Sequence, residues 1–264
     1  FEDCFAYNFE PYNYTESVTN VSITSSDSNI ISVVKGDDSK EKFVANNAGT
    51  CTLTFTLNDR ITCQKEVTVG SITSGKCGEN VIYSLDTSTG VLTISGTGHM
   101  YDYADWKKSY SPFHENEQIK SVIIESGVTW IGDYTFSNCT TLTSAQISDS
   151  VTHIGKYAFS GCSNLTSITL PNGLEDINEH TFYNCTSLTS ITIPNKVRWV
   201  CFNAFNGCSS LKNVTMSNGI QVIDDGAFHG CKSLTSITIP SSVWSIADNA
   251  FGDCSSLINI DVDK

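Results

Sequence analysis

The sequence predicts a mainly β fold, in which a small all-β domain precedes a repeat solenoid with a β cap at its N-terminal end. The first observation is a fixed period, because residues 127–264 align as six blocks of 23 residues without a gap. The second is that the apolar positions recur in register in every block, as the shared core of stacked turns requires. The third is an alternation of apolar residues with threonine between Cys51 and Leu57.

These observations divide the chain into four segments. The repeat's own strand pattern begins shortly before the first full block, with Ile119, Val122 and Ile124. We therefore expect an N-terminal domain over residues 1–70, a short linker over 71–76, a solenoid cap over 77–118 and repeats over 119–264, with six full blocks from residue 127.

Charge and hydrophobicity exclude several partners. The chain has 264 residues and a formal net charge of −13. Nucleic acid and anionic membrane surfaces would repel such a chain, so we expect neither as a partner. No apolar run approaches the ~20 residues of a membrane span, so we expect no membrane insertion.

The N-terminal domain contains a clear hairpin pattern. Apolar residues at alternate positions from Cys51 to Leu57 are separated by threonines, which is typical of a half-buried strand. Asn58 and Asp59 supply a short turn, and residues 61–67 return as the partner strand.

This domain resembles the bacterial immunoglobulin-like group 2 family, which implies a β-sandwich. The resemblance rests on an SSD-containing strand, a strand of the form A..AGT.T.T and a closing TVTV strand. In this chain the matching positions are residues 25–27, Ala45 with residues 48–50, and residues 66–69.

The match leaves the first strand of the sandwich unaccounted for. In that family a strand precedes the segment that Phe5, Tyr7 and Phe9 match, and nothing before Phe1 supplies it. Three alternatives remain: a truncated chain, a shifted alignment in which residues 1–14 are that strand, or a strand donated between chains. A sandwich without an edge strand exposes unpaired backbone. Phe1, Phe5, Tyr7 and Phe9 are therefore candidate assembly residues.

The cysteines fall into two groups. One cysteine occupies the same position in every block, between a phenylalanine and a leucine, and we expect a ladder of buried thiols. Its spacing lacks the paired geometry of a zinc site. The ladder contains Cys139, Cys162, Cys185, Cys208, Cys231 and Cys254. Outside it, the disulfide candidates in a secreted protein are Cys4, Cys51, Cys63 and Cys77, with no pairing assigned.

The solenoid closely resembles the BspA-like (Treponema-type) leucine-rich repeat family. The resemblance rests on the cap sequence CGEN…LTISGTGHMYDY and on six copies of [IV]-x-x-x-[AT]-F-x-x-C-x-x-L, over about 70% of the chain. Four blocks replace the glycine of Gly132 with Asn178, Cys201, Asp224 or Ala247, and there we expect the turn conformation, but not the fold, to change. The resemblance implies a surface or secreted protein for adhesion, binding or assembly, without catalysis.

No motif of an active site or cofactor site is present, so we expect no enzyme and no cofactor. There is no phosphate-binding loop, no HExxH and no GxSxG, and the five histidines are scattered. The outward strand positions form a hydroxyl-rich ladder without the anchors that usually carry interface energy. Candidate contact residues are instead Trp130, Trp199 and Trp244, which alternatively only cover the edge of the solenoid.

Glycosylation is a further expectation if the source cell glycosylates its proteins. The candidate asparagines stand in N-x-S/T sequences at Asn13, Asn20, Asn138, Asn164, Asn184 and Asn213.

The sequence therefore favours an extracellular or cell-surface, non-enzymatic protein. The first hypothesis is a structural subunit that assembles head to tail into a filament or surface layer, through a donated strand or end-to-end contacts. The alternative is an adhesin whose solenoid binds a host or matrix protein or a glycan. The partners are then copies of the chain itself or a component of another cell.

Overall fold

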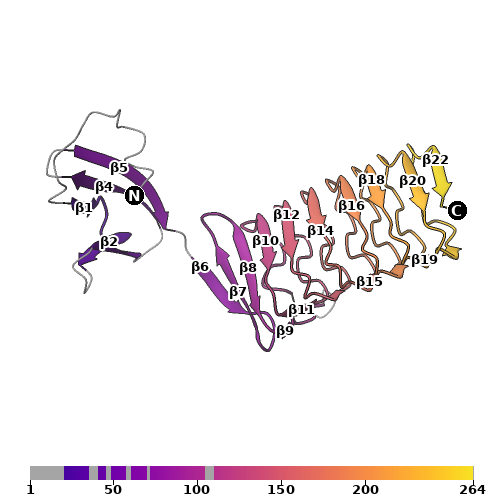
Figure 1. The fold of residues 1–264 in the computed structure, drawn as a ribbon, viewed down its shortest axis with the longest axis horizontal. Coiled ribbons are helices and arrows are strands. Elements are labelled where there is room, and N and C mark those ends of the chain that lie inside the picture. The colour runs from indigo at the N-terminus through magenta and orange to yellow at the C-terminus, as the bar shows by residue number, and fades with distance from the viewer. Residues whose placement is uncertain are drawn as a thin grey trace. The chain divides into compact units, whose positions relative to one another are not determined.

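The computed structural model describes residues 21–35, 41–45, 49–57, 61–69, 72–104 and 110–263. Throughout these residues the regular elements are β-strands (Figure 1). The chain divides into two compact units, Phe1–Ile72 and Thr73–Lys264.

The N-terminal unit contains two antiparallel sheets. Its strands are β1 (Val21–Ser25), β2 (Ile31–Lys35), β3 (Glu41–Ala45), β4 (Gly49–Leu57) and β5 (Ile61–Val69). The first sheet has the order β1-β4-β5, and β2 pairs with β3 in the second. The predicted pairing is confirmed, because β4 and β5 are antiparallel in register from Gly49 opposite Val69 to Leu57 opposite Ile61; the predicted turn at Asn58 and Asp59 lies outside the described residues. The predicted alternation is also confirmed, since Cys51, Leu53 and Phe55 are buried.

The assembly candidates Phe1, Phe5, Tyr7 and Phe9 lie outside the described residues. The three alternatives for the first strand therefore stay open, and the immunoglobulin-like sandwich stays a prediction.

The structure contradicts a disulfide between two of the candidate cysteines, Cys51 and Cys63. Cys51, Cys63 and Cys77 are free thiols. Cys51 pairs in register with Val67, and Cys63 with Phe55, so the first two cysteines are offset by four residues along the β4–β5 ladder. Four residues of strand span about 13 Å, whereas a disulfide needs Cα atoms within about 7 Å. Cys4 lies outside the described residues.

The solenoid begins with a four-strand cap. Its strands are β6 (Ile72–Lys76), β7 (Val81–Asp86), β8 (Val91–Gly96) and β9 (Gly98–His99). The predicted hairpin is confirmed as the antiparallel pair β7–β8. The linker expected over residues 71–76 is wrong from Ile72 onward, because β6 lies beside β7 at the edge of the cap sheet.

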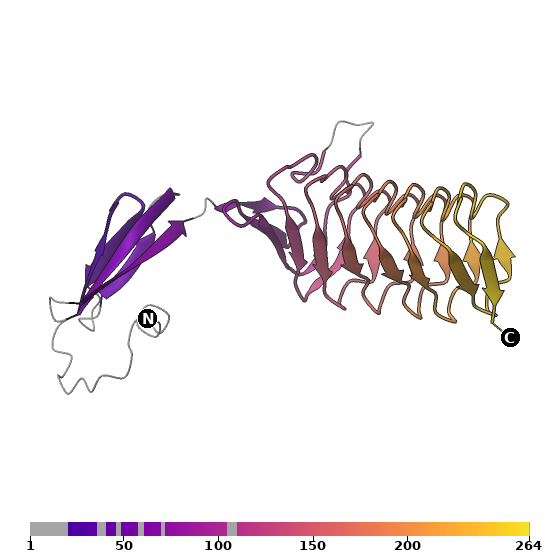
Figure 2. The ribbon, with the colours of Figure 1, turned by 90° about the horizontal axis from the view of Figure 1, so that it is seen from above.

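Each turn after the cap contributes two short strands to two parallel ladders (Figure 1). The first strands of the turns are β10 (Ser121–Ile124), β12 (Ser144–Ile147), β14 (Ser167–Thr169), β16 (Ser190–Thr192), β18 (Asn213–Thr215), β20 (Ser236–Ile239) and β22 (Asn259–Val262). The second strands are β11 (Val128–Ile131), β13 (His153–Ile154), β15 (Asp176–Ile177), β17 (Trp199–Val200), β19 (Val222–Ile223) and β21 (Ser245–Ile246). Paired residues of adjacent turns are 23 positions apart, as the sequence period predicts. Figure 2 shows the turns stacked in register.

A column of phenylalanine rings runs through the solenoid core. The ring centroids of successive turns are 5.1–5.6 Å apart. The column contains Phe113, Phe136, Phe159, Phe182, Phe205, Phe228 and Phe251. Phe113 precedes the first full block and was not predicted, although it lies one 23-residue period before Phe136.

The predicted ladder of buried thiols is confirmed. All six cysteines are buried and free. Each Sγ lies 2.9–3.5 Å from the carbonyl oxygen of a phenylalanine 26 residues earlier, in the preceding turn. Burial raises the pKa of Cys139 and of Cys208 to about 12, so both thiols stay protonated at neutral pH and donate hydrogen bonds. The thiols therefore link the turns as well as filling the core.

The glycine after the repeat isoleucine does not serve a special turn conformation. The φ angles of Gly132 and Gly155 are not positive. A Cβ on Gly132 would instead collide with the carbonyl oxygen of Tyr101. At the equivalent place, the side-chain amide of Asn178 donates to the carbonyl oxygen of Ile154 at 2.8 Å. The expected change in turn conformation was therefore the wrong explanation, since close packing between turns decides this position.

Candidate ligand-binding groove

The outward positions of β14, β16, β18 and β20, here called the strand face, carry short polar side chains. The central residues of β14, β16 and β20 point inward, and the residues on either side are exposed. The exposed residues include Ser167 and Thr169, Ser190 and Thr192, Asn213 and Thr215, and Ser236 and Thr238. This confirms the predicted hydroxyl-rich ladder. Its side chains offer hydrogen bonds but no large apolar anchor.

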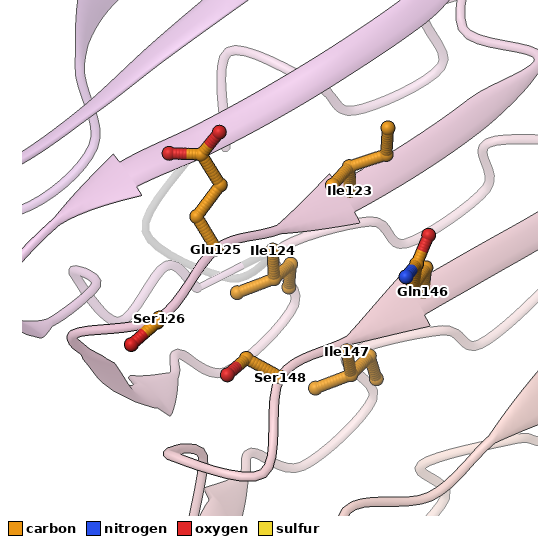
Figure 3. A pocket seen from close by; sticks show the side chains of 7 residues that line it. All are labelled: Ile123, Ile124, Glu125, Ser126, Gln146, Ile147 and Ser148. Carbon is orange, nitrogen blue, oxygen red and sulfur yellow. The ribbon is translucent and has the colours of Figure 1, made fainter.

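The strand ladder has a shallow hollow where β10 and β12 end (Figure 3). Ile123 and Gln146 project from the same side of the two strands, and Glu125 and Ser148 lie beyond their ends. The lining mixes apolar and polar groups without a cluster of titratable side chains. It offers a surface for contact, but no chemistry for a reaction.

A second groove lies along the other ladder, where β15, β17, β19 and β21 form a four-stranded parallel sheet. We call it the tryptophan groove. It has a volume of about 880 Å³ and runs between this sheet and the turns that precede each strand. Its residues are Glu175, Asp176, Asn195, Lys196, Arg198, Trp199, Asn218, Gly219, Gln221, Ser242 and Trp244.

Two exposed indoles lie in this groove. Trp199 is 52% exposed and Trp244 is 73% exposed. Trp199 pairs with Val222, and Val222 pairs with Ser245, the residue after Trp244. The two tryptophans are thus two turns apart, or about 10 Å along the solenoid at the usual strand spacing. Exposed aromatic residues near a guanidinium are typical anchors of a binding surface.

Charged groups of both signs accompany the indoles. Arg198 and Lys196 contribute positive charge, and Glu175 and Asp176 contribute negative charge. Burial raises the pKa of the Asp176 carboxyl, while a backbone hydrogen bond from Trp199 and the charge of Arg198 oppose this effect. The groove therefore carries no large net charge, unlike the whole chain.

The structure brings together two of the three predicted contact tryptophans. Trp130 is partly buried in a stack of rings, with centroid distances of 5.0 Å to His99 and 3.5 Å to His153. It lies outside the groove. Trp199 and Trp244 lie inside it, and their contact role stays a prediction.

Sequence reasoning missed the polar partners of the two tryptophans. Arg198 and Gln221 occupy the same block position as Glu175 and Trp244. From Glu175 onward this column changes its chemistry at every turn, whereas the strand face repeats serine and threonine. This contrast between the column of Arg198 and the strand face is the signal in the sequence that could have identified the polar partners.

The described sequon asparagines are all exposed: Asn138, Asn164, Asn184 and Asn213. Asn138 and Asn184 adopt left-handed backbone conformations, with φ of 58° and 56°. Asn13 and Asn20 lie outside the described residues.

The described part of the chain holds no group of three or more histidine, cysteine or acidic side chains that could bind a metal ion. Within the same residues, no helix is long and apolar enough to cross a membrane.

Comparison with known proteins identifies the repeat. A family model described as the BspA type leucine rich repeat region, in six copies, matches residues 109–201 and 175–264. No curated protein matches the chain.

Several solved structures are similar to the chain. A leucine-rich repeat protein from Bacteroides ovatus is 28% identical, with a TM-score of 0.57 over 74% of this chain and 52% of that protein. The leucine rich repeat protein of T. pallidum is also 28% identical, with a TM-score of 0.54 over 68% of this chain and 78% of that protein. The pneumococcal vaccine antigen PcpA, at 22% identity and a TM-score of 0.50 over 74% of this chain and 51% of that protein, shares the fold alone. The chain thus spans about half of the Bacteroides ovatus protein.

Proposed function

The chain belongs to the BspA type leucine rich repeat family, and from this premise we propose that it is a non-enzymatic adhesin at the cell surface or outside the cell. In this proposal the solenoid is a rigid support, and the tryptophan groove binds a component of another cell or of its matrix. Nothing in the described residues points to catalysis, since the titratable groups do not form a reactive cluster.

The exposure of Trp199 and Trp244 is the observation that carries this proposal. Both side chains leave a large apolar area in water, whereas the phenylalanine column from Phe113 to Phe228 is fully buried in the solenoid core. Burial of one such side chain against a partner contributes about 1.5–3 kcal/mol. Arg198, the residue before Trp199, adds a charged anchor.

The test is a binding assay on whole surfaces. The full chain is labelled and applied to cultured epithelial cells and to deposited extracellular matrix. The double variant Trp199→Ala/Trp244→Ala should lose at least about tenfold in affinity, because each tryptophan acts as an anchor worth 1 kcal/mol or more. Its melting temperature should stay unchanged, since both side chains are exposed.

The strand face offers a matched control. Thr192 and Thr238 are exposed and also lie two turns apart. The variant Thr192→Ala/Thr238→Ala should bind as the unmodified chain does. Equal binding by the two double variants would overturn the proposal that the tryptophan groove is the adhesive surface.

A second candidate function is self-assembly into a filament or surface layer. Its support is the apolar surface of the last turn, where Ile258, just before β22, is 89% exposed and Ile260 and Val262 of β22 are also exposed. The same residues would be covered by a further turn in a longer chain. Contact of this end with the N-terminal region of another copy would give an open, head-to-tail polymer.

Negative-stain microscopy and sedimentation velocity distinguish the two candidates. Filaments that disappear in a chain lacking residues 1–14, and also in Ile260→Lys, would establish assembly through both ends. A monodisperse monomer at all concentrations would rule it out, without affecting the adhesin proposal.

We also propose that the N-terminal unit is an immunoglobulin-like sandwich, supported by its two antiparallel sheets. An experimental structure of the full chain tests this, because a sandwich requires β1-β4-β5 to pack face to face on β2-β3.

Glycosylation of the exposed asparagines is a separate proposal. Secretion from a glycosylating host should give a mass that falls after enzymatic removal of N-linked glycans.

A further inference from the structure

The two exposed indoles of the tryptophan groove lie two turns apart. Trp199 lies in β17 and Trp244 directly precedes β21, so the ~10 Å between their turns is set by backbone hydrogen bonds. A ligand that contacts both indoles must therefore extend over about two turns of the solenoid.

The remaining groups of the groove combine hydrogen-bond donors with acceptors. Asn195, Asn218 and Gln221 each present a side-chain amide, which both donates and accepts. Glu175 accepts and Arg198 donates. A ligand rich in hydroxyl groups matches this set, because each hydroxyl also donates and accepts. A sugar ring has such hydroxyls around its rim and an apolar face of C–H groups that stacks on an indole.

The charge of the groove favours an uncharged ligand. Lys196 and Arg198 are balanced by Glu175 and Asp176, and the whole chain carries a net charge of −13. A sulfated or sialylated chain would meet no excess of positive charge in the groove and a long-range repulsion outside it.

An extended peptide fits the groove less well. Peptides that bind to sheets commonly add a strand to a free edge. Here β17 is paired on both sides, with β15 and with β19, and β19 is also paired with β21. The two central strands of the groove therefore have no free edge for a peptide strand, and only β15 and β21 lie at the edges of this sheet.

From these observations we propose that the tryptophan groove binds a neutral oligosaccharide, long enough to place one sugar ring on each indole. The proposal rests on the proposed function and names the class of ligand at the same groove. Trp199 and Trp244 stack on the rings, and the hydroxyls bond to Gln221, in the turn between the indoles, and to Arg198, beside Trp199.

The experiment uses the full chain on an array of neutral, sialylated and sulfated oligosaccharides, followed by calorimetric titration of the neutral oligosaccharides that bind. Trp199→Ala and Trp244→Ala should each weaken binding at least about tenfold. Gln221→Ala should weaken it about threefold to tenfold, through loss of a hydrogen bond. Thr192→Ala/Thr238→Ala should bind normally. A single sugar can contact only one indole. For such a ligand, the double variant Trp199→Ala/Trp244→Ala should therefore bind no more weakly than the single variants.

The outcomes separate this inference from the proposed function. Binding only of sulfated or sialylated chains would overturn the inference. No binding to any oligosaccharide, together with tryptophan-dependent adhesion that survives periodate oxidation of the target surface, would also overturn it and leave the adhesin proposal intact. Normal adhesion by the double tryptophan variant would overturn both.

Discussion

The strand face and the tryptophan groove are two outer surfaces of the same 23-residue repeat, yet their chemistry differs. The strand face repeats serine and threonine from turn to turn, as in Ser167 and Ser190. In the groove the equivalent residues of successive turns are Glu175, Arg198 and Gln221. The core beneath both is the same, because every turn contributes a phenylalanine and a cysteine. This difference shows that inward positions preserve the stack of turns, while outward positions are free to vary and can determine binding specificity.

The largest effect is expected from a substitution in the core that both surfaces share. Phe182→Ala removes a fully buried ring from the middle of the phenylalanine column. We expect a loss of about 3–5 kcal/mol in the free energy of unfolding, with distortion of both surfaces. Chemical denaturation followed by circular dichroism measures it. Phe202→Ala, at an exposed phenylalanine, is the control and should cost under about 1 kcal/mol.

A smaller effect is expected from the turns that connect the two surfaces. Gly161 has a φ of 73°, and a Cβ there would collide with Oδ1 of Asn138 in the preceding turn. Gly161→Ala should destabilise the chain by about 1–2 kcal/mol from backbone strain, and more from the collision. The same denaturation assay measures this loss.

A second substitution separates the two causes. In Asn138→Gly/Gly161→Ala, the Oδ1 that the new Cβ would meet is absent, whereas the left-handed backbone strain at residue 161 remains. The double variant should recover the part of the stability loss that comes from the collision. If it is as unstable as Gly161→Ala, contact between the turns does not explain the glycine.

The groove and the strand face can be distinguished by single substitutions that leave the core intact. Arg198→Ala should weaken adhesion about fivefold, since it removes a charged contact worth about 1 kcal/mol. Thr192→Ala should leave adhesion unchanged. Both should melt within about 2 °C of the unmodified chain. A larger loss with Thr192→Ala would assign adhesion to the strand face.

The smallest expected effect concerns the Asp176 carboxyl in the groove. Because burial raises the pKa of Asp176 in the folded chain, ionisation at neutral pH opposes folding, and this cost is relieved as the pH falls through the folded-state pKa. Asp176→Asn should therefore raise the melting temperature slightly at pH 7. The gain should vanish in acid, where both chains are uncharged at this position. A gain that grows in acid would mean that the pKa is lowered instead.

Much of the solenoid could be predicted from the sequence, because a stack imposes the same inward residues on every turn. The 23-residue period sets the strand register, and the column from Phe136 to Phe251 sets the core. The alternation from Cys51 to Leu57 likewise predicted a strand, since side chains alternate between the faces of a sheet. The same pattern failed at Ile72–Lys76, where a polar segment forms β6 because an edge strand needs only backbone pairing.

The sequence by itself determined the solenoid, since its period and its inward residues are local patterns that repeat. Only the tertiary structure decided which outward residues meet. Trp199 and Trp244 are 45 residues apart in the sequence and share a groove, whereas Trp130, which occupies the same block position as Trp199, is stacked between two histidines. The physical reason is that outward residues carry no packing constraint of their own. Their neighbours come from other turns, and the coiling of the backbone determines which residues these are.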